Sequence, residues 1–269
     1  MKPLALNEFE VGYTGIFDSH AHYDSAQFDG DRDEVLAALR ENGICGVIDV
    51  GCDPESSFKA AELARTVPGF YASVGYHPHE ADTYTDEDMA KIIELTKDPR
   101  VVAIGEIGLD YHYDFAPREK QKEVFEIQLK LAKELDLPVI IHSREATQDT
   151  LETLAKFPGL RGVVHCFSGS AETAKELLKM GFHIGFTGVI TFPNARKILE
   201  ACEIVPLDRI LLETDCPYMS PVPYRGKRCW SPLIRFTAEK AAELHGVEPQ
   251  QLIDAARENT IRLFGIENT

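Results

Sequence analysis

Short apolar segments alternate with segments of helical periodicity along the chain, and this alternation restricts the fold more than any other feature. The strand-like segments are 16–22, 46–52, 71–78, 101–108, 138–143, 162–168, 183–188 and 210–215. The helix-like segments are 31–41, 54–65, 86–96, 118–135, 146–156, 171–180, 194–202, 232–244 and 249–264. Continuously apolar strands separated by helices are typical of a parallel sheet that is covered on both sides.

Such an alternating chain forms either a closed barrel or an open, doubly wound sheet. The alternation is regular from end to end, and no glycine-rich nucleotide-binding loop follows any predicted strand, so the pattern favours the barrel. The length of 269 residues is compatible with two small domains or with one barrel of about 250 residues. Because no repeat or linker interrupts the chain, we expect one α/β domain over residues 1–269, a (β/α)₈ TIM barrel.

Histidines occupy alternate positions near the end of the first predicted strand. Asp18, His20 and His22 share one face of that strand, because side chains two residues apart point the same way. Two imidazoles at neighbouring positions on one face form a compact clamp for a divalent metal. An H-x-H pattern alone is weak support for a metal site, so the other strand ends decide the question.

Further ligand-type residues end other predicted strands: Glu106 the fourth, His142 the fifth, His165 the sixth and Asp215 the eighth. In a (β/α)₈ barrel the carboxyl ends of the strands converge on one mouth, where the active site lies. An ionisable group there is costly unless it is paired or coordinates a metal. We therefore predict that one metal centre is formed by His20, His22, Glu106, His142, His165 and Asp215.

Four histidines and two carboxylates exceed the needs of one tetrahedral ion. They suit two divalent ions, zinc, magnesium or manganese, that share a carboxylate and lie about 3.5–4 Å apart. Glu106 is the natural bridge. Two such ions activate a water for attack on a phosphoryl or carbonyl centre, and Asp215 could accept the proton of that water. Glu106 and Asp215 are therefore the predicted catalytic residues.

The motifs F-D-S-H-A-H (17–22), G-E-I-G-L-D-Y (105–111), I-I-H-S-R-E-A (140–146), H-C-F-S-G (165–169) and E-T-D-C-P-Y (213–218) occur in this order along the chain. As a set they closely resemble the TatD-type metal-dependent deoxyribonucleases of the amidohydrolase superfamily. The resemblance implies a (β/α)₈ barrel, a divalent metal centre and hydrolysis of DNA phosphodiesters, often from the 3′ end. Carried over residue by residue, the family ligands match the six residues named above. The sequence departs from an R-G-K-R-N-like family segment at 225–230, where Cys229 stands in place of the Asn.

Cations near the mouth are candidates for holding phosphates, because the formal net charge of −16 should otherwise repel a polyanion. Arg144 lies two residues after His142, and three cations follow Asp215 in the loop after the last strand: Arg225, Lys227 and Arg228. They could bind phosphates through charge-assisted hydrogen bonds, or they could form a solvated loop surface.

Three further side chains have alternative roles at the same mouth. His77, after the third predicted strand, could contact a scissile phosphate or order its loop by a hydrogen bond. Tyr224 and Trp230 could stack on an unpaired base or pack the loop that carries them. These residues complete the predicted substrate side of the site.

The sequence favours a cytoplasmic protein without a membrane partner, and we expect a monomer. Residues 1–15 contain Glu8 and Glu10 and no apolar run, so neither a secretory signal nor an anchor is expected. The six cysteines form no C-x-x-C pair, which suggests reduced, packed thiols. Cys166 and Cys216 adjoin predicted ligands but should face the core, because neighbouring strand residues point to opposite sides.

Three functional hypotheses remain. The leading one is a deoxyribonuclease of the 3′–5′ exonuclease type that acts on single-stranded DNA or on DNA ends. The second keeps the chemistry but changes the substrate to another ester or an amide, as in a deacylase that acts on aminoacyl-tRNA. The third is a barrel that only binds a ligand or partner, and the complete set of ligand-type residues argues against it.

Overall fold

Eight parallel strands, hydrogen-bonded in chain order, form the sheet of a (β/α)₈ barrel in this computed structural model, which describes residues 11–267. The strands are β1 (Ile16–Ala21), β2 (Ile44–Val50), β3 (Phe70–Val74), β4 (Val101–Asp110), β5 (Val139–Arg144), β6 (Gly162–Val164), β7 (His183–Phe186) and β8 (Ile210–Leu212). The expected fold class is confirmed. The N-terminal segment for which no signal was expected lies largely outside the described residues.

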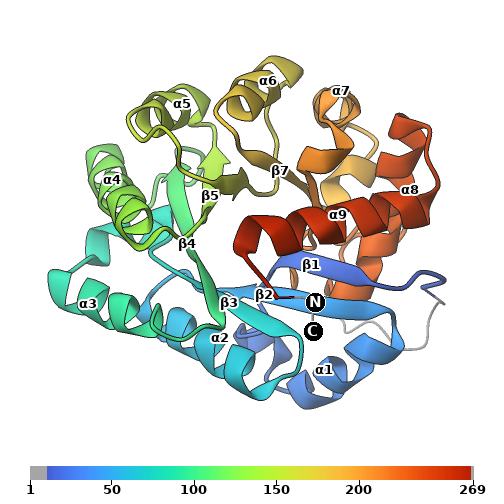
Figure 1. Cartoon of the computed structure of the whole chain (residues 1–269), viewed down its shortest axis with the longest axis horizontal. Helices are drawn as coiled ribbons and strands as arrows, with labels where there is room; N and C mark the ends of the chain where they lie inside the picture. Colours follow the sequence, from blue (N-terminus) through green and yellow to red (C-terminus); the bar gives the residue numbers. More distant parts are fainter. Residues whose placement is uncertain (1–10, 268–269) are drawn as a thin grey trace.

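Helices surround the barrel (Figure 1). They are α1 (Arg32–Glu41), α2 (Pro54–Thr66), α3 (Asp86–Leu95), α4 (Arg118–Leu135), α5 (Thr147–Ala155), α6 (Ala171–Lys179), α7 (Arg196–Ile204), α8 (Ile234–His245) and α9 (Pro249–Phe264). Short 3₁₀ helices span Ala26–Phe28, Pro78–Thr83, Gly188–Thr191, Leu207–Arg209 and Ser231–Leu233. Local sequence explains several helix ends. At the start of α2, for example, the Asp53 carboxylate accepts the Ser56 backbone N–H, and the Ser56 hydroxyl accepts that of Asp53.

The first and last strands meet beyond the end of β8. The backbone N–H of Asp215 donates to the His20 carbonyl at 2.9 Å, and that of His22 donates to the Cys216 carbonyl at 2.7 Å. These bonds fix the segment after β8 against the end of β1. They therefore bring two regions of predicted ligands side by side although almost 200 residues separate them along the chain.

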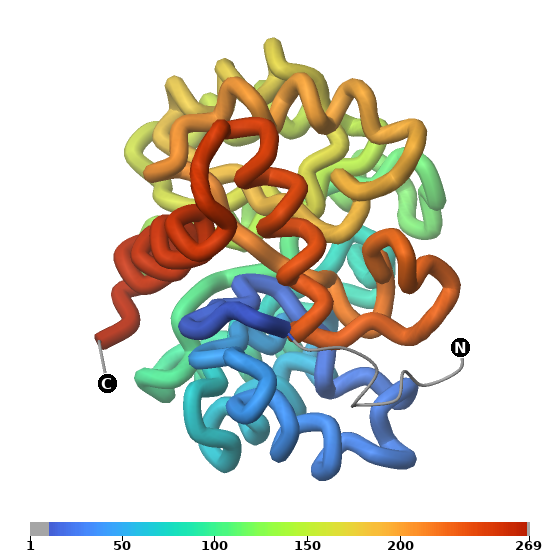
Figure 2. Tube along the Cα trace, turned by 90° about the vertical axis from the view of Figure 1, so that its right-hand side faces the viewer, coloured from blue at the N-terminus to red at the C-terminus, as the bar shows by residue number. Residues whose placement is uncertain are grey.

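Apolar side chains fill two regions, one between the sheet and the helices and one inside the barrel. Within the barrel, Phe17, Tyr71 and Val102 lie near the amino ends of their strands and pack with Leu263 and Phe264 of α9. Helix α9 therefore covers the amino-end opening. In Figure 1 it lies across the front, and in Figure 2 it lies on the side opposite the orange loop after β8. The other, carboxyl-end opening is left for a site.

Several predicted strand ends differ from the structure, and two of the differences, in β4 and β8, concern strands that were expected to end on a ligand. Strand β4 continues four residues past Glu106, because Gly108 and Asp110 still pair with β5. Gly108 allows this close pairing, since its φ is +145° and an added Cβ would overlap the His142 carbonyl. Strand β8 ends at Leu212, three residues before Asp215, which has a positive φ of 57° and leaves the extended conformation.

Smaller differences concern helix boundaries and the cysteines. The helix expected at 232–244 is a 3₁₀ turn followed by α8, and the one expected at 194–202 is shifted to Arg196–Ile204. Cys45 is exposed on β2, so the expectation of packed thiols is wrong for this residue. Cys216 is buried as expected, but Cys166 is only partly buried.

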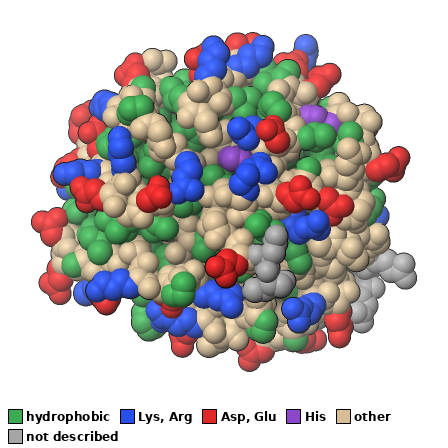
Figure 3. Space-filling view, viewed as in Figure 1, with side chains coloured by type: hydrophobic (Ala, Val, Ile, Leu, Met, Phe, Trp, Pro, Cys, Tyr) green, Lys and Arg blue, Asp and Glu red, His purple; other side chains and the backbone are tan. Residues whose placement is uncertain are grey.

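Surface charge is mixed on the face that α9 covers. Lys and Arg side chains are interspersed there with Asp and Glu (Figure 3). Among the helices in residues 11–267, none has the length and apolar character needed to cross a membrane.

Candidate metal centre

The side chains of all six predicted ligands converge at the carboxyl-end mouth. His20 and His142 lie within β1 and β5, and His22 and His165 lie directly after β1 and β6. Their nitrogen atoms and the carboxylate oxygens of the two acids form overlapping groups in which potential ligand atoms lie within 4.8 Å of one another. The strands of the barrel thus assemble residues from five places in the chain.

The carboxylate of Glu106 lies in the middle of the cluster and is almost fully buried. Its Oε1 atom is 2.6 Å from His165 Nε2 and 2.7 Å from His142 Nδ1. Its Oε2 atom faces the other side and lies 3.4 Å from His20 Nε2. The two oxygens of one side chain therefore face two different groups of nitrogen donors.

Asp215 belongs to the group that Oε2 of Glu106 faces. Its Oδ1 atom lies 3.3 Å from His22 Nε2 and 3.8 Å from His20 Nε2, and these two nitrogens are 3.2 Å apart. The other ring nitrogen of His22, Nδ1, lies 2.8 Å from the Val50 carbonyl and donates to it. A neutral His22 therefore directs the lone pair of Nε2 towards Asp215, as a metal ligand requires.

The buried carboxylates of the cluster favour the binding of positive charge, as the shifted pKa values of its side chains show. Burial would lower the pKa of His22, yet the Asp215 carboxylate raises it to about 10. Burial acts in the same direction on His142, and hydrogen bonds to Asp110 and Glu106 raise its pKa to about 9. Burial would raise the pKa of Glu106, but the neighbouring histidines hold it well below its usual range. Two ionised carboxylates buried among histidines are stabilised by cations, either protons or metal ions.

The donor set fits divalent metal ions. Ligands at about 2.0–2.1 Å from a tetrahedral zinc lie about 3.3 Å from one another. The separations among His20, His22 and Asp215 include values of 3.2 and 3.3 Å, and His142 Nδ1 lies 3.3 Å from His165 Nε2. Nitrogen and carboxylate ligands in such groups match the chemistry of zinc and other first-row divalent metals.

Side chains behind the ligands orient these histidines, and they were not among the predicted site residues. Asp110 is buried, and its Oδ2 atom lies 3.0 Å from both His142 Nε2 and His79 Nε2. With its Nε2–H donated to Asp110, His142 turns Nδ1 towards Glu106. A carboxylate behind a metal-binding histidine is a common arrangement. The spacing of Glu106 and Asp110, an even number of residues on one strand, was the available signal.

Glu213 lies behind His165. Its Oε1 atom accepts the backbone N–H of Cys166 and is 3.9 Å from His165 Nδ1. Burial raises the pKa of Glu213 to about 8. Gly185 leaves the space for this carboxylate, since a Cβ there would overlap it. Asp18, although on the same strand as His20, bonds to Thr214 and Ser231 and stays outside the cluster.

Of the residues predicted to contact substrate, His77 lies in the cluster, whereas Arg144, Arg225 and Lys227 lie over aromatic rings. His77 is buried with Nε2 3.5 Å from Glu106 Oε1, so it lies in the cluster. The Arg144 guanidinium lies over the Tyr113 ring at 4.8 Å. Arg225 is exposed, 4.0 Å above the Phe192 ring, and Lys227 lies over the Tyr224 ring at 5.4 Å.

Arg228 is bonded to the segment between β1 and α1. Its guanidinium forms two hydrogen bonds to the Asp31 carboxylate, at 2.8 and 2.5 Å, and one to the Gln27 carbonyl at 2.7 Å. Only 10% of its side chain is exposed. Arg228 thus ties the loop to the start of α1, and its guanidinium is already bonded to oxygens of the protein itself. Trp230 is buried, which agrees with the expected role of packing the loop and not with stacking on an unpaired base.

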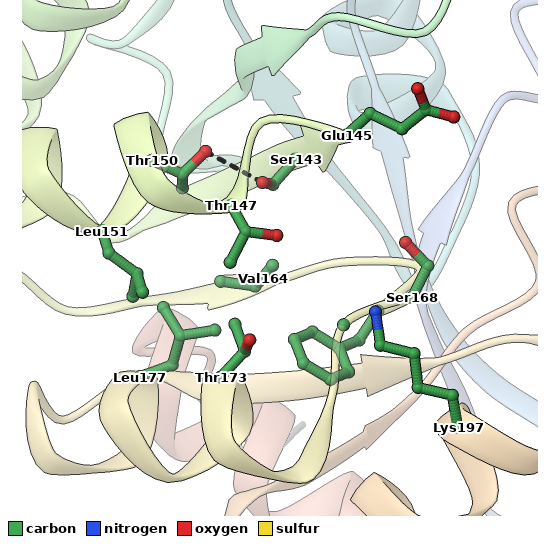
Figure 4. Close-up of a pocket in the computed structure, with 12 residues that line it drawn as sticks. Ser143, Glu145, Thr147, Thr150, Leu151, Val164, Ser168, Thr173, Leu177 and Lys197 are labelled. Atoms are coloured by element: carbon green, nitrogen blue, oxygen red, sulfur yellow. Dashed lines mark hydrogen bonds between the residues drawn. The ribbon is translucent and has the colours of Figure 1, made fainter.

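A separate pocket of about 140 Å³ lies on the other side of the barrel wall (Figure 4). Ser143 and Val164, which line it, adjoin His142 and His165 in sequence, and neighbouring strand residues point to opposite sides. Apolar side chains and hydroxyls line most of the pocket, including Ser143 and Thr150, whose oxygens are 2.8 Å apart, and the charged side chains of Glu145 and Lys197 complete the lining. It therefore lacks the donor set of the metal centre.

A (β/α)₈ barrel with clustered histidines and carboxylates at its carboxyl-end mouth defines this protein as a metal-dependent hydrolase. Residues 17–265 match the TatD related DNase family. The chain belongs to this TatD family.

Similar proteins carry different names. YabD of Bacillus subtilis, described as an uncharacterized metal-dependent hydrolase, is 43% identical over 254 residues, which cover 93% of this chain and 99% of that protein. A protein of Cronobacter sakazakii called 3′-5′ ssDNA/RNA exonuclease TatD is 37% identical over 261 residues, 93% of this chain and 97% of that one. The crystal structure of the Escherichia coli TatD homolog YjjV superposes with a TM-score of 0.88 at 32% identity and covers 94% of this chain and 98% of that one.

Proposed function

We propose that this protein is a divalent-metal-dependent exonuclease that removes nucleotides from the 3′ end of single-stranded DNA. The observation that carries the proposal is the position of Glu106, whose two oxygens face two groups of donors. His20, His22 and Asp215 would hold one ion, His142 and His165 a second, and Glu106 would bridge them. Bound ions would supply Lewis-acid activation of a water and neutralise charge on the phosphate.

The residues of the chain perform the remaining steps. Burial would raise the pKa of Asp215, but its hydrogen bond with His22 and the nearby histidines lower it, so the carboxylate is ionised at neutral pH and can accept a proton from the attacking water. His77 Nδ1 accepts the His79 backbone N–H, so a neutral His77 carries its proton on Nε2. That N–H faces the cluster and can donate to a non-bridging oxygen of the phosphate.

The name of the Cronobacter relative supports a single-stranded nucleic acid as the substrate. The formal charge of −16 makes an uncharged ester or amide the second candidate. An aminoacyl ester of tRNA would use the same chemistry, although tRNA is itself a polyanion. The chemistry of the cluster serves either substrate, so the choice between them requires a direct assay.

A substrate panel tests the proposal. Purified protein reconstituted with zinc, magnesium or manganese would be given DNA single strands labelled at the 5′ or the 3′ end, duplex DNA, RNA, small phosphodiesters, small carboxylic esters and aminoacyl-tRNA. We expect stepwise shortening of the 5′-labelled strand and early release of the label from the 3′-labelled strand. Cleavage of aminoacyl-tRNA or small esters without cleavage of any strand would replace the proposal by the second candidate.

A further inference from the structure

Two exposed aromatic side chains follow β4 at the rim of the mouth. Tyr113 is 49% exposed and Phe115 is 68% exposed, the highest value for a large apolar side chain within residues 11–267. Their rings stack with centroids 5.3 Å apart and an angle of 25° between the ring planes. Exposing this much aromatic surface to water is unfavourable, which is why such a pair indicates a binding surface.

The pair is connected to the proposed metal centre through one histidine. The His79 ring meets Phe115 edge to face at 4.9 Å and Tyr113 at 5.4 Å. The same ring contacts Asp110, which in turn contacts His142, both at 3.0 Å. The aromatic pair is thus separated from the proposed ligand His142 by only two side chains, His79 and Asp110.

A cation adjoins the pair without a carboxylate partner. The Arg144 guanidinium lies over the Tyr113 ring, and within the described chain Arg144 forms no ion pair with an acidic side chain. The nearby Arg118, by contrast, is neutralised by Asp114. In a protein of net charge −16, an unneutralised arginine on an aromatic ring beside the active site is suited to a ligand that is both aromatic and anionic.

We propose that Phe115, backed by Tyr113, stacks on an unpaired base of a single-stranded nucleic acid while Arg144 contacts a phosphate next to that base. The inference rests on the proposed function and specifies how the strand is held. Every base has a flat π face, so stacking tolerates any sequence. In a duplex the bases are already stacked and paired, so this surface favours single strands.

Single abasic positions provide the sharpest test, because they remove one base and keep every phosphate. Steady-state kinetics of the metal-loaded enzyme would be measured on 12-nucleotide thymidine strands that carry one abasic position, moved stepwise from the 3′ end. We expect KM to rise at one position by about 5- to 150-fold, the effect of about 1–3 kcal/mol per stacked base at 1.4 kcal/mol per tenfold. Phe115→Ala should raise KM for the intact strand similarly and abolish the penalty of the abasic position.

Matched variants separate stacking from general effects. Phe115→Trp should retain the abasic penalty, and Phe115→Leu, which keeps apolar bulk without a π face, should lose most of it. Leu135→Ala removes a 38% exposed apolar side chain at the other end of α4, roughly 25 Å away, and should change nothing. The kcat for methyl p-nitrophenyl phosphate, a small diester that reports on the metal centre at saturating concentration, should be equal in the wild type and Phe115→Ala.

The outcomes distinguish this inference from the proposed function. If the wild type cleaves intact and abasic strands with the same KM, the stacking proposal is overturned and the nuclease proposal stands. If it hydrolyses the small diester but no strand, both are overturned. Light scattering adds a third outcome. A wild-type dimer that becomes a monomer in Phe115→Ala would make the aromatic pair a contact between copies of the chain and would overturn the stacking proposal.

Discussion

Asp215 combines two roles at the scale of single residues. Its positive φ turns the chain out of the barrel three residues after β8, and the hydrogen bond from its backbone N–H to the His20 carbonyl holds the turn against β1. The carboxylate is thereby fixed beside His22 and His20 before any substrate arrives. Such preorganisation is what a group that accepts a proton in the reaction requires.

Replacing Asp215 by Asn tests its part in proton transfer. Asp215→Asn keeps the shape and one oxygen ligand but removes the charge and the basicity. We expect kcat to fall at least about 10²-fold with little change in KM, because general acid–base help contributes roughly 10²–10⁴-fold. Metal analysis of the same variant is the control. Retention of full metal content together with normal kcat would show that Asp215 is not the base and would direct attention to His77.

Glu106 is expected to dominate metal retention. We predict up to two divalent ions per wild-type chain after reconstitution, measured by plasma emission spectroscopy. Glu106→Ala should lose more metal than His20→Ala or His165→Ala, since the two oxygens of Glu106 face the two donor groups. Equal losses in all three variants would argue against a bridge, and the absence of metal in the wild type would argue against the centre itself.

At the scale of elements, the strand-like and helix-like segments were readable from periodicity, and the six ligand-type residues were readable from their places near strand ends. The ends of β4 and β8 could not be predicted in this way. Pairing with β5 determines where β4 ends, and the positive φ of Asp215 marks where the chain leaves the direction of β8. The tie between Arg228 and Asp31 joins residues 197 positions apart and left no local signal. His79 was missed for the same reason, since its partner Asp110 lies 31 residues away.

In the loop after β8, we expect Arg225 and Lys227 to bind substrate phosphates and Arg228 to stabilise the fold. Arg225→Ala combined with Lys227→Ala should raise KM for single-stranded DNA and reduce the slope of log KM against log salt by up to about 1.4, at roughly 0.7 per phosphate contact. Metal content and kcat should be unchanged. Unaltered KM and salt dependence would identify the loop as solvated surface.

Arg228→Ala is the contrasting variant for that loop. It breaks the largely buried pair with Asp31, so we expect the free energy of unfolding to fall by roughly 1–3 kcal/mol, measured by urea denaturation. The salt slope of KM should stay at the wild-type value. A changed slope would return Arg228 to the substrate contacts.

At the scale of the whole molecule, the amino-end face carries a pH-sensitive group far from the proposed chemistry. His183, at the start of β7, is buried and neither of its ring nitrogens has a hydrogen-bond partner. Burial first, and then Arg209 and Arg262, lower its pKa to about 4. Between pH 4 and pH 6.5, this histidine therefore binds a proton in the unfolded chain, where its pKa is near 6.5, but not in the folded chain.

Stability should fall in a defined pH window because of His183. The loss begins as the pH drops below about 6.5, continues to about 4, and amounts to at most roughly 3 kcal/mol. His183→Phe keeps a flat ring without titration. Urea denaturation at pH 7.5 and pH 4.5 should therefore show a smaller loss in His183→Phe than in the wild type. Equal losses would mean that His183 does not cause the pH dependence.

The fold itself followed from the regular alternation of strands and helices, but the role of α9 did not, since its sequence resembles that of any amphipathic helix. Apolar side chains fill the barrel interior, and Leu263 and Phe264 of α9 pack against them at the amino end, so no passage leads through the described part of the barrel. Whatever enters must leave by the way it came, so a strand cannot be threaded through the molecule. A released nucleotide and the remaining strand would then compete for the same carboxyl-end mouth, and we expect the nucleotide product to be a competitive inhibitor.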